Sequence, residues 1–145
     1  LDIGYLPQKS RIDSRFPVTV AEVVAMGLIG KKLSRKDSAL LLDDMLARVG
    51  LSDYAATPIG ELSGGQLQRA LFGRALITNP EVLILDEPMN ALDKDAVEEM
   101  RRLFLSFKAS GKTMLIVSHN EGDISTLCDE VYEFDGARIK RRENV

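Results

Sequence analysis

The chain of 145 residues has little of what marks secreted, membrane-spanning or nucleic-acid-binding proteins. Its single cysteine, Cys128, excludes an internal disulfide and fits a reducing compartment. The formal net charge of −3 provides no overall basic field, so we expect no nucleic-acid partner. No apolar run reaches the roughly 18 residues of a membrane span, and no stretch has the pattern of a signal peptide. A link to a membrane would therefore depend on a partner protein.

A phosphate-binding loop of the G-x-x-x-x-G-K-[ST] type is also missing. The segment Ser110-Gly111-Lys112-Thr113 has the last three letters of the motif, but Ser106 stands where its first glycine belongs. The segment also follows a predicted helix and enters a predicted strand, which is the reverse of the required order. Gly111 is better explained as the residue that ends the helix.

The composition is that of a globular protein, with 45% hydrophobic and 28% charged residues, and the length allows one domain at most. The chain starts at Leu1 within a strand-like segment, and from this we expect it to be a piece of a longer protein.

Hydrophobic periodicity and end signals predict helices and strands in the following order. The predicted elements are a strand at 3–6, helices at 19–29, 34–50 and 63–77, a strand at 82–85, a helix at 93–111, a strand at 114–117, a short helix at 124–127, and a hairpin of 131–134 and 137–140 around Asp135-Gly136. The two short apolar runs at 82–85 and 114–117 are typical of parallel strands covered on both faces.

The stretch Leu62-Ser63-Gly64-Gly65-Gln66 starts a helix in a way that capping alone does not explain. Ser63 and Gln66 have the spacing of a reciprocal capping box. The two glycines each cost about 1 kcal/mol relative to alanine in a helix. They leave the free N–H groups bare, so an anion can approach the positive end of the helix dipole. We interpret the stretch as a phosphate-binding helix start, with an ordinary cap as the alternative.

Both buried strands are followed by polar residues, Asp86-Glu87-Pro88 after the first and Ser118-His119 after the second. Ligands of parallel sheets bind outside the carboxyl ends of the strands, so Asp86, Glu87 and His119 should converge there. One carboxylate of such a pair can hold Mg²⁺ and the other can polarise a water for attack on phosphorus. The alternatives are that the acidic pair only begins a loop and that His119 is a hydrogen-bonded core histidine.

Taken together, these segments resemble the ATP-binding cassette (ABC) ATPases over essentially the whole chain. The matching motifs, in the order of the family, are the Q-loop at Tyr5-Leu6-Pro7-Gln8, the signature at Leu62-Ser63-Gly64-Gly65-Gln66, the Walker B strand and catalytic glutamate at 82–88, the D-loop at Asn90-Ala91-Leu92-Asp93, and the switch histidine at Ser118-His119. Two departures are Asn90, where the D-loop usually has Ser or Thr, and Asn120, where Asp is common after the histidine. The segments 16–20 and 24–27 further resemble subunits that energise the uptake of manganese, zinc or iron.

The resemblance implies roles for the residues at the strand ends. Asp86 would coordinate Mg²⁺, Glu87 would act as general base, and His119 would stabilise the γ-phosphate of ATP. Gln8 would contact the metal or the attacking water and report to a transmembrane permease subunit. The protein would then lie in the cytoplasm, on the inner face of the cell membrane.

The resemblance also implies a second ATPase subunit, because the family closes as a head-to-tail dimer around two ATP molecules. Ser63, Gly64 and Gly65 would grip the γ-phosphate of the nucleotide held by the opposite subunit. Gln66 and Asp93 belong to the same nucleotide-binding set.

The family carries its phosphate loop, an adenine-stacking aromatic and an antiparallel subdomain before the Q-loop, and this chain has none of them. We therefore expect that the chain alone neither binds ATP tightly nor hydrolyses it. The strand of the phosphate loop would lie beside residues 113–117, so its absence should expose a hydrophobic edge and favour self-association.

The fold predicted from these motifs is α/β, a partial P-loop NTPase core with a parallel sheet, an inserted α-helical subdomain and a carboxyl-terminal β-hairpin. We divide this incomplete domain into a Q-loop part at 1–10, a helical signature part at 11–80 and a Walker B and switch-histidine part at 81–145. Two other functions stay open. One is a non-catalytic module that only pairs through its signature helix; the other is a DNA-repair or chromosome-structuring ATPase, which would need a long coiled coil between Gln8 and Leu62.

Overall fold

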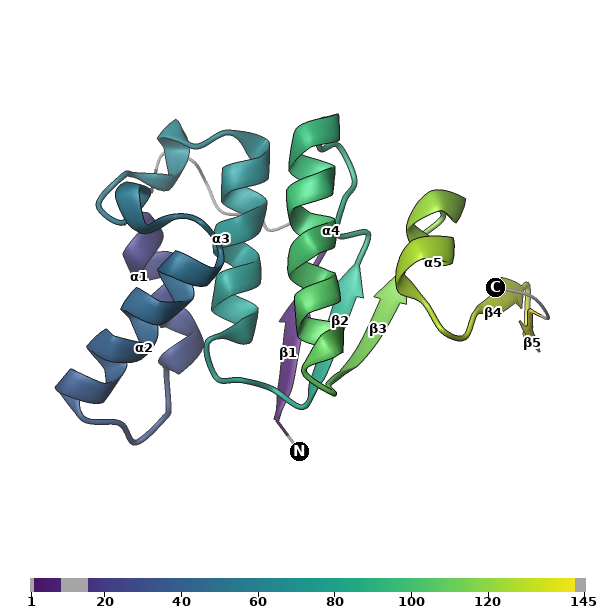
Figure 1. Ribbon diagram of the computed structural model, residues 1–145, viewed down its shortest axis with the longest axis horizontal. Coiled ribbons are helices and arrows are strands. Elements are labelled where there is room, and N and C mark those ends of the chain that lie inside the picture. Colours follow the sequence, from purple (N-terminus) through teal and green to yellow (C-terminus); the bar gives the residue numbers. More distant parts are fainter. Residues whose placement is uncertain (1, 9–15, 143–145) are drawn as a thin grey trace.

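A computed structural model describes residues 2–8 and 16–142 of the chain (Figure 1). The helices are α1 (Val20–Ala25), α2 (Arg35–Arg48), α3 (Gly64–Leu76), α4 (Lys94–Ala109) and α5 (Glu121–Leu127). The strands are β1 (Ile3–Leu6), β2 (Val82–Asp86), β3 (Thr113–Val117), β4 (Tyr132–Asp135) and β5 (Arg138–Arg141), and short 3₁₀ turns occupy Met26–Leu28, Ser52–Tyr54 and Ile59–Glu61.

Strands β1, β2 and β3 form a parallel sheet in that order. Leu6 pairs with Leu85, and Leu85 pairs with Ile116, so the three strands end at one edge of the sheet. The α/β fold with a parallel sheet that the sequence predicts is thereby confirmed.

Helices α3 and α4 lie on one face of this sheet, as Figure 1 shows. Leu6, Leu83 and Leu85 point into the core beneath them and are fully buried. Phe72 of α3 and Phe104 of α4 pack edge to face, with ring centroids 5.0 Å apart and an interplanar angle of 76°. The core of the chain therefore lies between the sheet and these two helices.

The opposite face of the sheet carries side chains that are more than half exposed. They are Ile3 (55%) and Tyr5 (53%) of β1 and Leu115 (56%) and Val117 (53%) of β3. Tyr5 and Leu115 flank Ile84 in the sheet register, so they share its face. The prediction that the apolar strands are covered on both faces is wrong for the residues that the structure describes, because both covering helices lie on the same side.

Helices α1 and α2 begin at residues that the sequence identifies as caps. The Thr19 hydroxyl and the Glu22 carboxylate cap α1 reciprocally, and Ser34 accepts a hydrogen bond from the Asp37 N–H at the start of α2. Val20, Val23 and Val24 of α1 are fully buried, and α1 packs against both α2 and α3. Helices α1 and α2 thus form a packed helical unit with α3.

Two predicted boundaries near the carboxyl terminus need correction. The hairpin loop consists of Gly136 and Ala137, because Asp135 still pairs with Arg138 in the ladder. Gly136 has a φ of +59°, and a glycine at the first loop position suits a type II′ turn. Helix α5 begins at Glu121, three residues earlier than predicted, because Asn120 caps it.

In the described parts of the chain, no helix has both the length and the apolar character that crossing a bilayer needs.

Candidate functional site

The acidic pair lies where β2 ends beside β3. Asp86 pairs with Val117 in the sheet, and the Glu87 N–H donates to the Val117 carbonyl oxygen at 2.8 Å. Glu87 has a φ of +48°, a left-handed conformation that costs a non-glycine residue about 1–3 kcal/mol. The turn therefore leaves the sheet directly after Asp86, and the ladder to β3 holds the strained residue in place.

His119 follows β3 by two residues and contacts Glu87. Nδ1 of His119 lies 2.5 Å from Oε1 of Glu87. A carboxylate oxygen accepts hydrogen bonds, so the contact is a hydrogen bond in the tautomer that carries its proton on Nδ1. The Glu87 side chain is 14% exposed, whereas that of His119 is 80% exposed. The two residues converge as expected, and His119 is not a core histidine.

Gln8 and Asp86 lie at the same edge of the sheet. Gln8 is exposed and comes two residues after Leu6, which pairs with Leu85, the neighbour of Asp86. Asp86 itself is half-buried. The register therefore brings Gln8, Asp86, Glu87 and His119 to the carboxyl ends of three adjacent strands.

The capping box at the start of α3 forms as predicted. The Gln66 N–H donates to Ser63 Oγ at 3.2 Å, and the Ser63 N–H donates to Gln66 Oε1 at 2.9 Å. Gly64 is exposed, and a Cβ added there would meet no atom within 4 Å. The backbone at Gly64 is therefore open to an approaching group.

Gly65 has a packing role that the sequence did not reveal. A Cβ at Gly65 would lie 2.6 Å from Cβ of Ala96 in the first turn of α4. The Asp93 carboxylate caps that turn by accepting from the Ala96 N–H at 2.9 Å. The interpretation of both glycines as bare anion contacts is thus incomplete for Gly65. The close packing of α3 against α4 is by itself enough to require a glycine there.

A hydrogen bond that the sequence did not predict joins the signature helix to the acidic pair. Nε2 of Gln68 donates to the Pro88 carbonyl oxygen at 2.8 Å across 20 sequence positions. Pro88 follows Glu87 directly. The signature spacing puts Gln68 on α3, but its partner could only be found from the tertiary structure.

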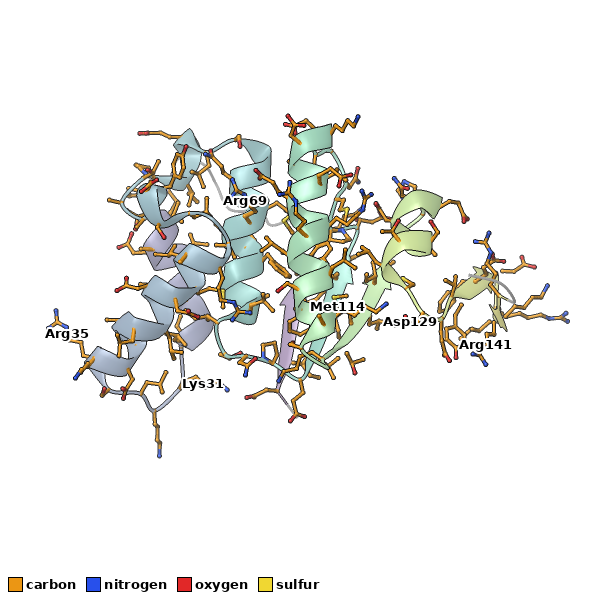
Figure 2. All side chains as sticks on the ribbon, in the orientation of Figure 1. Lys31, Arg35, Arg69, Met114, Asp129 and Arg141 are labelled. Carbon is orange, nitrogen blue, oxygen red and sulfur yellow. The ribbon has the colours of Figure 1, made fainter. Side chains whose placement is uncertain are left out.

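Among the described residues, no hydrogen bond or ion pair joins the signature residues Ser63, Gly64 and Gly65 to Glu87 or His119. These two groups of predicted site residues belong to different elements, the start of α3 and the ends of β2 and β3. A shallow hollow of about 240 Å³ lies elsewhere, lined by residues of α3, of α4 and of the end of α2. Arg69, which Figure 2 labels, is one of its lining residues. Arg69 donates there to the carbonyl oxygens of Val49 and Gly50, so it ties the end of α2 to α3.

The residues at the strand ends suit a cation that is held jointly with a ligand. No group of three or more His, Cys, Asp or Glu side chains within the described ranges could hold a metal ion. A protein cage for a metal is therefore not part of these ranges. Mg²⁺ is typically bound by one or two carboxylates together with substrate phosphates and waters. The single half-buried carboxylate of Asp86 fits that arrangement.

Comparison with known proteins places the chain in a family. The sequence profile of the ABC transporter family matches residues 1–90. The chain belongs to the ABC transporter family. A nucleotide-free ATP-binding cassette from an ABC transporter matches 98% of the chain and 62% of its own length, with a TM-score of 0.77 and 26% sequence identity. The fold and the motif order thus agree with the resemblance found in the sequence.

Two curated relatives have transport names. The manganese transport system ATP-binding protein MntA of Synechocystis sp. is 40% identical over 132 residues, which cover 88% of the chain and 50% of the relative. The zinc uptake system ATP-binding protein ZurA of Listeria monocytogenes is 40% identical over 148 residues, which cover 93% of the chain and 57% of the relative. The chain spans about half the length of the curated relatives that it matches.

Proposed function

We propose that this chain is part of an ATP-hydrolysing subunit of an ABC transporter that energises the uptake of a transition-metal ion. The contact between Glu87 and His119, at the ends of two neighbouring parallel strands in a member of this family, is the observation that carries the proposal. The manganese and zinc transport names of the relatives support the class of cargo. The cargo itself would be recognised by other subunits.

In this proposal the strand-end residues divide the chemistry of hydrolysis. Glu87 accepts the proton of the attacking water, and His119 stabilises the γ-phosphate. Asp86 would hold Mg²⁺, which would neutralise charge on the phosphates. Gln8 would contact the metal or the water and would pass the state of the site to a permease subunit. The transporter would therefore hold this subunit on the inner face of the cell membrane.

The signature residues would act on a second copy of the subunit. Ser63, Gly64 and Gly65 begin a helix of 13 residues, and helix N-termini favour phosphate groups. The open backbone at Gly64 supports this role. Gln66 and Asp93 would belong to the same nucleotide-binding set, and their side chains cap α3 and α4. The proposed division into a Q-loop part (1–10), a signature part (11–80) and a Walker B part (81–145) follows from these roles.

The alternative of a non-catalytic pairing module is less well supported. A module that only paired through α3 would have no use for a glutamate held in a left-handed conformation against a histidine. Backbone strain of this kind is concentrated at functional sites. We therefore favour the ATPase over the pairing module.

The proposal is tested by joining the chain to the amino-terminal half of the Synechocystis relative and measuring phosphate release from ATP. We expect hydrolysis that requires Mg²⁺ and both halves. A folded chimera that binds ATP, measured with a fluorescent analogue, yet releases no phosphate would contradict the proposal.

We further propose that the chain alone binds ATP weakly and does not hydrolyse it, because its 145 residues contain no phosphate loop. Calorimetric titration of the isolated chain with ATP and Mg²⁺ should give no binding in the micromolar range. Micromolar affinity would refute this second statement and leave the first one standing.

A further inference from the structure

Asp123, on helix α5, is the only buried charged residue in the described ranges, with 7% of its surface exposed. Its Oδ1 lies 3.3 Å from Nη2 of Arg101 on α4. Arg101 also pairs with Glu98 on its own helix. A buried carboxylate is costly unless a cation and hydrogen bonds compensate for lost water. The chain therefore keeps an expensive ion pair between α4 and α5.

This ion pair is not built for maximum stability. Within the described ranges, Nε of Arg101 is buried without a hydrogen-bond partner. Replacing such a pair by apolar side chains of similar volume is often neutral or stabilising in other proteins. What an ion pair adds over an apolar contact is a direction, because Nη2 of Arg101 must point at Oδ1 of Asp123 to donate to it. The pair is therefore suited to fixing how α5 sits on α4.

Helix α5 needs such a fixed point. It has seven residues, and Leu127 near its end is the only other buried one. Asp123 lies in its first turn, four positions after His119. The placement of this first turn thus depends on Asp123 more than on apolar packing.

A series of hydrogen bonds connects that turn to His119. Oδ1 of Asn120 accepts from the N–H groups of Gly122 (2.9 Å) and Asp123 (3.3 Å), and the Asn120 N–H donates to Ser118 Oγ at 3.1 Å. His119 lies between Ser118 and Asn120, so both of its neighbours are tied into the start of α5. Packing alone does not fix the imidazole, because its side chain is 80% exposed.

We infer that Asp123, through its buried ion pair with Arg101, positions the His119 ring against Glu87. Asp123 and Arg101 are positioning residues, since neither contacts the proposed reacting groups. Their effect on hydrolysis rests on the proposed function, whereas their effect on the histidine does not.

Because His119 is the only histidine in the chain, ¹⁵N NMR of the isolated protein reports on its ring without assignment ambiguity. The E87A variant supplies the Nδ1 resonance of a ring released from the carboxylate. At a fixed pH of about 8.5, well above the ordinary histidine pKa of about 6.5, we expect D123N to move this resonance most of the way from the wild-type value to the E87A value.

The matched control is D129N. It breaks the ion pair between Lys108 Nζ and Asp129 Oδ1, which are 2.6 Å apart. This pair joins α4 to a residue two positions after the end of α5. D129N should leave the Nδ1 resonance at the wild-type value. A D123N spectrum that coincides with the wild type, or a D129N shift as large as that of D123N, would overturn the inference.

A second variant separates loss of the ion pair from loss of the folded structure. The double variant R101M/D123L should unfold at a urea concentration no lower than the wild type does, yet it should still shift the Nδ1 resonance toward the E87A value. A wild-type resonance in this variant would show that the directional ion pair is not needed, and would refute the inference. In the active chimera, D123N should lower kcat at least tenfold with little change in KM for ATP. If the chimera hydrolyses no ATP, the proposed function fails while the NMR result still decides the positioning role.

Discussion

Oε1 of Glu87 lies 2.5 Å from Nδ1 of His119, although 32 positions separate the two residues in the chain. The contact arises because parallel strands β2 and β3 end together, and because the Glu87 N–H extends their ladder to the Val117 carbonyl. The sheet thereby joins a carboxylate and an imidazole that belong to different motifs. The proposed hydrolysis depends on this pair.

The first prediction concerns Glu87 as general base. In the active chimera, E87Q should lower kcat by about 10²–10⁴, because the amide cannot accept the proton of the attacking water. ATP binding should be retained, since the substitution preserves shape and removes no contact with the phosphates. Phosphate release and binding of a fluorescent ATP analogue measure the two effects. An E87Q chimera with more than a tenth of the wild-type kcat would argue against this role.

The second prediction separates the two signature glycines. G65A should lower the free energy of unfolding by about 1–3 kcal/mol, because the new methyl group would lie 2.6 Å from Cβ of Ala96. G64A should leave stability unchanged or raise it by up to about 1 kcal/mol, because that position faces open space and alanine favours the helix. Urea denaturation followed by circular dichroism measures both. Equal effects of the two substitutions would contradict the packing role of Gly65.

The third prediction concerns the contact between α3 and α4. F104A should lower the free energy of unfolding by about 3–5 kcal/mol, because it removes a fully buried ring that packs against Phe72. F134A in the hairpin is the matched control; its ring is 77% exposed, so stability should change by less than about 0.5 kcal/mol. The same denaturation experiment applies. A small loss in F104A would mean that the core does not depend on this pair.

The fourth prediction concerns the open face and edge of the sheet. β3 is an edge strand of the described sheet and presents Leu115 and Val117, each more than half exposed, on the uncovered face. Edges of this kind promote pairing between copies, so we expect the isolated chain to associate. L115K should shift it toward the monomer in light scattering, whereas L40K on α2, where the leucine is 59% exposed, should not. A monomeric wild-type chain would exclude this association.

The fifth prediction concerns pH and Cys128. Burial raises the pKa of the Cys128 thiol above its ordinary value. The thiolate is the reactive form, so the midpoint of the pH profile for alkylation by iodoacetamide should be higher in the native chain than in denaturing urea. Restricted access would slow the reaction at every pH without moving this midpoint, and a single cysteine makes the mass-spectrometric assay unambiguous.

The raised pKa of Cys128 also makes the free energy of unfolding depend on pH. Because the folded pKa is the higher one, its contribution is fully present below the unfolded pKa and is lost as the pH rises through the folded value. C128S should therefore flatten the decline of stability on the alkaline side. If stability falls equally with pH in C128S and in the wild type, the alkaline decline is caused by other titratable groups.

Local signals predicted most of the elements correctly. Ser63, Thr19 and Asp93 cap helices by accepting hydrogen bonds from N–H groups three positions later. The starts of α3, α1 and α4 could therefore be predicted from spacing alone. The one-residue error in the hairpin arose because Asp135-Gly136 is a common turn pair, while the ladder decides which residues remain paired.

Contacts between distant segments could not be predicted in this way. The Gln68 bond to Pro88 and the Gly65 contact with Ala96 depend on how α3 lies against α4. Periodicity shows that an apolar strand can be buried, but it does not show whether a second layer is present. The exposed face at Tyr5 and Leu115 therefore became apparent only in the structure.

The sequence by itself determined the family of this protein, its helix starts and the types of residue at its strand ends, because those features depend on neighbours within a few positions. The convergence of Glu87 and His119 at the strand ends was expected from the sequence, but the tertiary structure decided that their side chains touch. It also decided that Asp123 pairs with Arg101, because helix packing brings together atoms from distant parts of the chain. Such distances follow from the packing of the whole chain, which no local pattern encodes.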